Sequence, residues 1–184
     1  MIETVFAMAL AAAVRCQQMA VEPPEVPLVS VEKPVETEER EMVKQEVWTA
    51  PMPEEHLAYL VACCEKEGVP VEIALALIER ESGFQADAVS ATDDHGYMQI
   101  NACHFVSALK WYDLLPKSKP LDNIKYGVWL LAENYRTFGS WGRALMVYAD
   151  GFNAMKRPEW VQGFTERELI LLDRADEIRE NGGV

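Results

Sequence analysis

Apolar and polar residues follow a helical period over most of the chain from residue 54 onward. Apolar residues recur at spacings of three and four, which is typical of helices that pack one face against a core. Glycine, proline and capping residues interrupt the pattern where helices would end or begin. Helices are predicted over approximately 54–67, 71–82, 102–113, 122–138, 141–150 and 166–180. Residues 85–95 are predicted to form a loop, and residues 97–101 a short, buried, strand-like segment.

The helix predicted over 71–82 carries a carboxylate on its apolar side. Three apolar residues and one glutamate share a face at i, i+3, i+4 and i+7 spacing: Ala74, Leu77, Ile78 and Glu81. The other two glutamates, Glu72 and Glu79, are predicted to lie on the opposite, solvated face. Gly83 predicts the end of the helix directly after Glu81.

Glu81 is therefore a candidate general acid. A carboxylate in the last turn lies near the negative end of the helix dipole, and partial burial also disfavours its charged form. Both effects predict a raised pKa and a protonated carboxyl group near neutral pH, which general acid catalysis requires. The alternative is an ordinary surface glutamate at a frayed helix end.

The first fifty residues have a different character. Residues 4–14 form an apolar run that is too short for an ordinary membrane span but fits the core of a signal peptide. Glu3 stands where a basic residue is expected, and Arg15 before Cys16 does not suit a lipoprotein signal. Residues 1–20 are predicted to be a signal or membrane-proximal segment, with a short interfacial helix as the alternative.

Residues 21–52 are predicted to be a disordered, acidic, proline-rich linker, because prolines and clustered glutamates prevent regular packing. Trp48 is an exception that could dock onto the domain formed by residues 53–184. The net charge of −13 argues against nucleic acid as a partner. The four cysteines form no CxxC pair. The sequence alone leaves undecided whether Cys63 or Cys64 forms a disulfide with Cys103.

Two further helices carry residues of interest. Gly127 lies inside the predicted 122–138 helix, where glycine costs about 1 kcal/mol relative to alanine. This cost predicts a close helix–helix approach at Gly127. Tyr148 lies on the apolar face of the 141–150 helix, where an ordinary core tyrosine is the alternative to a functional one.

Several short segments, taken in order, resemble the lytic transglycosylase (SLT-type) domain of the lysozyme-like superfamily. They are ESGF at 81–84, AVS at 88–90, GYMQIN at 96–101, LDNIKYGVWLL at 121–131 and ALMVYADG at 144–151. The resemblance covers roughly residues 53–151 and continues more faintly to the C-terminus. The last segment departs from the family pattern, because Ala149 replaces the usual asparagine between Tyr148 and Gly151.

The resemblance implies a mainly α, lysozyme-like domain in which a short strand-like or loop segment lines the cleft. It also implies that Glu81 is the single catalytic acid and base, and that Tyr148 hydrogen-bonds it. Substrate-binding residues implied with it are Ser82, Tyr97, Met98, Gln99, Asn101 and Tyr148. The implied reaction is non-hydrolytic cleavage of the β-1,4 bond between N-acetylmuramic acid and N-acetylglucosamine, with a 1,6-anhydro product.

Two other functions remain open. A muramidase would use water, held by Asp93 or Asp94 opposite Glu81. A non-catalytic peptidoglycan-binding module of a secretion or phage-like assembly would keep the cleft without turnover; Ala149 favours this reading, whereas the intact Glu81 and Tyr148 oppose it. No cofactor or metal is expected. A metal site would have to come from Asp93, Asp94, His95 and His104, and no pair among them has the i, i+4 spacing of a helical metal site. The expected partner is the peptidoglycan glycan strand, at the cell envelope or outside the cell.

Overall fold

The computed structural model describes residues 47–184. The predictions for residues 1–20 and for the linker up to residue 46 lie outside these residues. Residues 47–52, which the pattern assigned to the linker, lie against the domain. Trp48 packs against the hydrophobic core as expected, and Thr49 forms a parallel bridge with Gly183 at the other end of the described chain.

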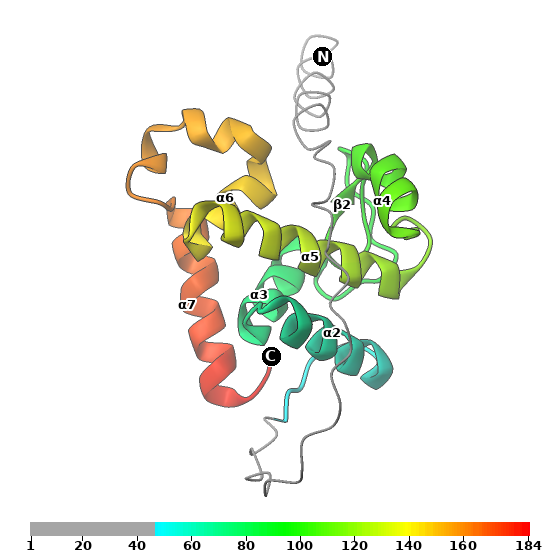
Figure 1. Ribbon diagram of the computed structural model, residues 1–184. Coiled ribbons are helices and arrows are strands. Elements are labelled where there is room, and N and C mark those ends of the chain that lie inside the picture. The colour runs from blue at the N-terminus through cyan, green and yellow to red at the C-terminus, as the bar shows by residue number, and fades with distance from the viewer. Residues whose placement is uncertain (1–46) are drawn as a thin grey trace, which may run out of the picture.

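The described residues form a mainly α domain, as predicted, with one small antiparallel hairpin (Figure 1). The α-helices are α2 Glu54–Glu67, α3 Val71–Ser82, α4 Phe105–Tyr112, α5 Pro120–Phe138, α6 Trp141–Asp150 and α7 Glu166–Asn181. Short 3₁₀ segments are η1 Ala102–His104, η2 Gly151–Lys156 and η3 Pro158–Trp160. Strands β1 Asp94–His95 and β2 Ile100–Asn101 form the hairpin, with Asp94 opposite Asn101.

Helix ends follow the local signals in the sequence. Gly68, Gly83 and Gly182 follow α2, α3 and α7 in the left-handed conformation that glycine adopts without strain. The predicted capping box between Thr165 and Glu168 is present at the start of α7. These signals place the helix boundaries within one or two residues of the predicted ones.

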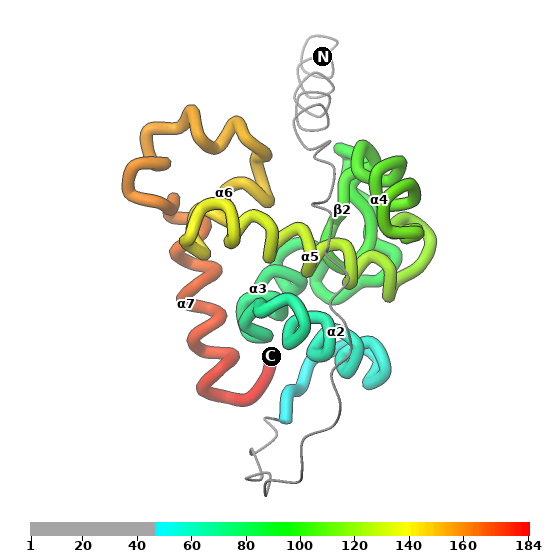
Figure 2. Tube along the Cα trace, viewed as in Figure 1, coloured from blue at the N-terminus to red at the C-terminus, as the bar shows by residue number. Residues whose placement is uncertain are grey.

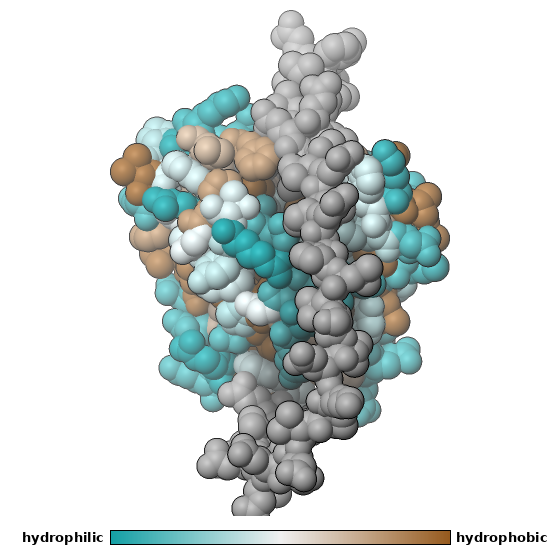
Figure 3. All heavy atoms as spheres, viewed as in Figure 1, coloured by the Kyte–Doolittle hydropathy of each residue, from teal (hydrophilic) through white to brown (hydrophobic). Residues whose placement is uncertain are grey.

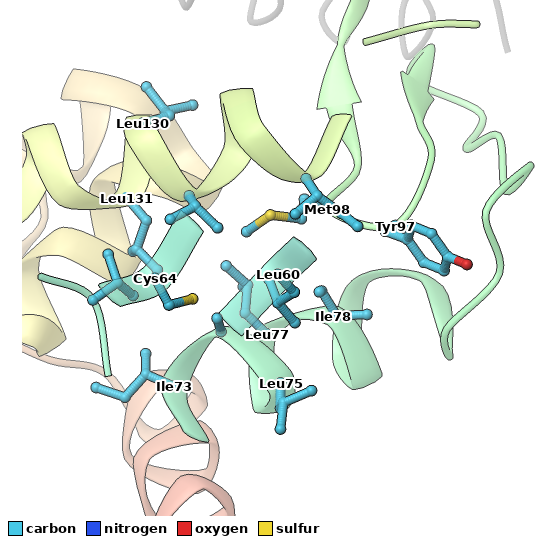
Figure 4. Close-up of a cluster of buried hydrophobic side chains, with 14 of the residues drawn as sticks. Leu60, Cys64, Ile73, Leu75, Leu77, Ile78, Tyr97, Met98, Leu130 and Leu131 are labelled. Carbon is cyan, nitrogen blue, oxygen red and sulfur yellow. The ribbon is translucent and has the colours of Figure 1, made fainter. Parts of the chain in front are cut away.

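Helix α5 crosses the centre of the domain, with α2 and α3 on one side of it and the hairpin with α4 near its N-terminal end (Figures 1 and 2). Helix α2 packs against α5, α5 against α6, and α3 against α7. Fully buried apolar side chains from these elements meet in one core, among them Leu60, Ile78, Met98, Ile124 and Leu131. Figure 4 shows part of this core between α5 and α3.

Helix α3 differs from its predicted half-exposed state, because α7 covers its second side. Glu79 accepts hydrogen bonds from Arg174 at 2.8 and 3.1 Å, and Glu72 lies 3.9 Å from the guanidinium of Arg179. The prediction of a solvated face is therefore wrong for Glu72, whose side chain is 15% exposed. The Glu79 side chain is 35% exposed, and only its pairing with α7 was not predicted. Spacing within one helix does not show that a second helix, a hundred residues later, covers the polar face.

The predicted helix over 102–113 consists of η1 followed by α4. Ala108 is buried, and Phe105 and Tyr112 pack against the core, but Leu109, which was predicted to pack, is 50% exposed. Helix α4 contributes further exposed apolar side chains, Val106 and Trp111. Figure 3 shows apolar residues on the surface at the edge where α4 lies in Figure 1.

Among residues 47–184, no helix combines the length and the apolar character needed to cross a bilayer. Cys63, Cys64 and Cys103 form no disulfide with one another, so the bridge that the sequence left undecided is not formed among the described residues.

Candidate active site

Glu81 lies in the last turn of α3, as predicted. The helix ends because Gly83 adopts the left-handed conformation and donates its N–H to the Glu79 carbonyl. The Glu81 side chain is 23% exposed, and its Oε1 lies 3.9 Å from the guanidinium of Arg80. Ser82, the neighbouring predicted site residue, donates its hydroxyl to the Ile78 carbonyl one turn back, at 3.2 Å. Glu81 thus lies on a regular helix and is partly accessible from solvent.

The turn of the hairpin, residues 96–99, carries three predicted site residues. Gly96 and Gln99 both have positive φ, 74° and 46°, which reverses the chain tightly. The Gln99 side-chain NH₂ group donates to the carbonyls of Gly96 at 2.9 Å and Ala88 at 3.2 Å. Gln99 therefore braces the turn and joins it to the preceding loop, while its amide oxygen takes no part in these two bonds.

Tyr97 and Met98 point into the protein rather than out of it. Their exposed fractions are 2% and 0%, and Figure 4 shows both side chains beside α3 and α5. The Tyr97 hydroxyl is 2.9 Å from Nδ1 of His56 on α2. Their substrate-binding role stays a prediction.

The close approach predicted at Gly127 exists, but its partner is the hairpin turn and not another helix. A Cβ at Gly127 would lie 2.4 Å from Met98 Sδ and 2.7 Å from Met98 Cβ. Glycine at this position therefore lets the turn pack directly on the backbone of α5.

Tyr148 on α6 joins the turn to the neighbourhood of Glu81. Its hydroxyl donates to the Met98 carbonyl at 2.8 Å. Burial, and after it the negative charge of Glu81, raises the pKa of Tyr148 well above its ordinary value, with smaller contributions from Tyr126 and Asp94. The negative charge of Glu81 therefore acts on Tyr148, although the two residues lie on different helices.

A small pocket lies beside Tyr148, with a volume of about 30 Å³. Polar side chains from the hairpin, η1 and α6 line it, namely Asp94, Gln99, Asn101, His104 and Tyr148. A pocket of this volume holds only a few water molecules, so a saccharide would lie over the pocket and not inside it. Gln99, Asn101 and Tyr148 are the predicted site residues that the structure gathers here.

Asn101 and Asp94 bind each other across the two strands. The Asn101 side chain donates to Asp94 Oδ1 at 2.8 Å and to the Thr92 carbonyl at 2.8 Å, and it accepts from the Cys103 N–H at 3.1 Å. Asp94 Oδ2 accepts from the hydroxyls of Ser90, at 2.7 Å, and Thr92. Both oxygens of Asp94 are thus engaged within the protein.

Asp93 is paired with His95 at 2.6 Å and its side chain is 63% exposed. These contacts give Asp93 and Asp94 a role in stabilising the loop and the hairpin. In the part of the chain that the structure describes, no group of three or more histidine, cysteine, aspartate and glutamate side chains is arranged to hold a metal ion.

Asn123 on α5 is a residue that the sequence analysis did not single out. It has no exposed surface, and its Oδ1 accepts from the Met98 N–H at 2.9 Å. Its NH₂ group donates to the His95 carbonyl at 2.7 Å and to the Pro116 carbonyl at 3.1 Å. The sequence feature that could have drawn attention to Asn123 is its position one helical turn before Gly127, on the apolar face of α5.

Residues 59–170 match the family model described as the transglycosylase SLT domain. The match spans more than half of the chain, and the chain belongs to this family, as its motifs predicted.

Similar proteins agree with this assignment. Protein IpgF of Shigella flexneri is 29% identical over 123 residues, which cover 64% of this chain and 81% of that protein. Protein IpgF of Shigella sonnei is 27% identical over the same shares. Among solved structures, an inactive glutamate-to-glutamine mutant of lytic transglycosylase Slt from Pseudomonas aeruginosa matches with a TM-score of 0.55 and 19% identity. That match covers 72% of this chain but only 25% of the Slt chain, and it supports the fold.

Proposed function

We propose that this protein is a peptidoglycan lytic transglycosylase in which Glu81 is the single general acid and base. The observation that carries the proposal is the setting of Glu81. It ends a rigid helix, is partly exposed, and lies close enough to the anchored Tyr148 hydroxyl to act on it electrostatically. An exposed, frayed glutamate would not have this setting.

In the proposed reaction, protonated Glu81 donates its proton to the oxygen between N-acetylmuramic acid and N-acetylglucosamine. The bond from C1 of the muramyl sugar to that oxygen breaks, and the glucosamine side leaves with a hydroxyl group. Glu81, now a carboxylate, takes the proton of the muramyl 6-hydroxyl while that oxygen bonds to C1. No water is consumed, and Glu81 returns to its protonated form.

One carboxylate is sufficient for this sequence because the substrate supplies the nucleophile. A hydrolase of the inverting type needs a second carboxylate that holds water. The contacts of Asp93 with His95 and of Asp94 with Ser90, Thr92 and Asn101 disfavour that role for either residue.

The substrate assignment places the protein at the cell envelope, with glycan strands as its partner. For the substrate-binding residues, we propose that the sugar lies across the pocket, with the Gln99 amide oxygen within reach. Membrane association through residues 1–20 and membership of a secretion or phage-like assembly remain predictions.

The test is mass analysis of the soluble fragments that the full-length chain releases from purified peptidoglycan. We expect anhydro-muramyl ends from the wild type, and a loss of at least about 100-fold in release for Glu81→Gln, since a general acid contributes that much or more. A glutamate-to-glutamine mutant of the structurally similar Slt is inactive, which makes this substitution a suitable choice.

Glu79→Gln is the matched control, because it makes the same chemical change two residues away, on the side of α3 that faces Arg174. It should keep release within about twofold of the wild type, since an ion pair this exposed contributes little. Reducing ends instead of anhydro ends would assign the protein as a muramidase. Binding to peptidoglycan without any release would assign it as a binding module.

A further inference from the structure

The hairpin turn is fixed to α5 by one buried side chain. Asn123 uses its oxygen and both N–H groups on main-chain atoms of Met98, His95 and Pro116, at 2.9, 2.7 and 3.1 Å. The hairpin and the loop that precedes α5 are thereby held at one point. Asn123 has no exposed surface. Because all of its side-chain hydrogen bonds go to loop backbone, it determines where the turn lies.

Two glycines allow this attachment. A Cβ at Gly96 would lie 2.6 Å from the Asn123 side-chain nitrogen, and one at Gly127 would lie 2.4 Å from Met98 Sδ. Real Cβ atoms do not approach other heavy atoms so closely, so glycine is needed on both sides of the contact. The hydrogen bonds of Asn123 thus hold the turn against α5, and Gly96 and Gly127 permit the close contact.

The attachment sets the position of the Met98 carbonyl, which accepts the hydroxyl proton of Tyr148 at 2.8 Å. A tyrosine hydroxyl has a single hydrogen to donate. While that hydrogen is donated to the Met98 carbonyl, the Tyr148 hydroxyl can form a further hydrogen bond only as an acceptor.

We propose that Asn123 is a positioning residue of the active site, which fixes the Met98 carbonyl so that Tyr148 faces Glu81 as an acceptor and favours its protonated form. The inference rests on the proposed role of Glu81 as general acid. A protonated carboxyl group can donate to Tyr148, whereas a carboxylate would need the hydroxyl hydrogen that Met98 holds.

Other charged and titratable groups surround this arrangement. Arg80 on α3, 3.9 Å from Glu81, favours the carboxylate. Asp94 on β1, His104 on η1 and Tyr126 on α5 lie on the Tyr148 side, where Asp94 and His104 line the same pocket and His104 is 3.3 Å from the Tyr126 hydroxyl. Arg80 and an accepting Tyr148 hydroxyl would thus act on the Glu81 carboxyl group in opposite directions.

The test is the pH dependence of fragment release by the full-length chain carrying Asn123→Ala. Without the asparagine, the Met98 carbonyl is no longer held, and the Tyr148 hydroxyl is free to donate to Glu81. The carboxylate is then favoured, and activity that depends on the protonated acid is lost at lower pH. We expect the alkaline limb of the profile to move about one pH unit toward acid.

Gly127→Ala serves as a second variant, because it displaces Met98 without removing the Asn123 side chain. The same shift of the alkaline limb is expected. Asn134→Ala is the matched control: Asn134 is another buried asparagine of α5, and it donates to the Ala144 carbonyl at 3.3 Å, away from the hairpin. Asn134→Ala should lower the melting temperature but leave the alkaline limb of the pH profile at its wild-type position.

The Tyr148→Phe background shows whether Asn123 acts through Tyr148. There, Asn123→Ala should produce no further shift, since the hydroxyl through which it acts is absent. An unmoved limb in Asn123→Ala, with a lower melting temperature only, would make Asn123 a purely structural residue and overturn the inference. An equal shift in the Tyr148→Phe background would overturn it as well. Retained activity in Glu81→Gln would instead defeat the proposed function itself, so the two failures are distinguishable.

Discussion

At the scale of single residues, Glu168 is a carboxylate with no exposed surface. Burial alone would raise its pKa, but hydrogen bonds from the Thr165 hydroxyl, the Arg167 guanidinium and the Thr165 N–H outweigh burial and hold the pKa of Glu168 below its ordinary value. Arg167 also lies 3.4 Å from Asp150 at the end of α6. Glu168 therefore joins the start of α7 to the end of the helix that carries Tyr148.

The lowered pKa gives a pH-dependent contribution to stability. A group whose pKa is lower in the folded state stabilises the fold above its ordinary pKa of about 4.5, and this contribution is lost as the pH falls through the folded-state value. We expect the free energy of unfolding to decrease in that acidic range, and Glu168→Gln to reduce the decrease. Urea unfolding between pH 7 and about pH 3 measures this.

Glu166→Gln provides the comparison, because Glu166 lies in the same first turn of α7 but is exposed. Its pH dependence should match that of the wild type. Parallel curves for the wild type and Glu168→Gln would contradict the role assigned to the buried carboxylate.

At the scale of secondary-structure elements, α7 acts as the second support of α3. The family match ends at residue 170, so most of α7 lies beyond it. Nevertheless Leu171, Ala175 and Ile178 are buried, and α7 packs on the helix whose last turn carries Glu81. The C-terminal helix is therefore part of the framework of the site, although it contributes no residue to it.

This packing predicts a large effect of truncation in α7. Ile178 has no exposed surface, so Ile178→Ala should lower the free energy of unfolding by about 2–4 kcal/mol, through lost burial and the cavity left behind. Ile170, which is 62% exposed, offers the control, and Ile170→Ala should change stability by no more than about 0.5 kcal/mol. Equal, small effects in urea unfolding would mean that α7 does not support the domain.

The elements also show what the sequence could predict. Helix α2 was predicted with its observed bounds, and Glu81 was placed in a last turn, because Gly68 and Gly83 are local signals read directly from the chain. The partners of Asn123 could not be predicted in this way, since they are backbone atoms of a turn about 25 residues away. Likewise, the exposure of Leu109 depends on which side of α4 meets the core, and periodicity alone does not give this.

At the scale of the whole molecule, the two ends of the described chain meet at the end of α3 remote from Glu81. Thr49 donates its N–H to the Gly182 carbonyl at 3.0 Å, and Val184 donates to the Thr49 carbonyl at 2.9 Å. Helices α3 and α7 run antiparallel, because Glu72 pairs with Arg179 and Glu79 with Arg174. The chain preceding residue 47 therefore joins the domain about 15 Å along α3 from Glu81, at a rise of about 1.5 Å per residue.

The contact between the chain ends depends on glycine at position 183. A Cβ there would lie 2.1 Å from Thr49 Oγ1 and 2.4 Å from the Thr49 carbonyl oxygen, so Gly183→Ala must separate the two segments. We expect faster amide hydrogen exchange at Thr49 and Val184 and a loss of about 1–2 kcal/mol in stability for the two hydrogen bonds. Val47→Ala, at a neighbouring residue that is 79% exposed, should leave both amides protected. Fragment release should persist in both variants, because the contact lies away from Glu81. Unchanged amide protection in Gly183→Ala would show that the two chain ends are not held together in solution.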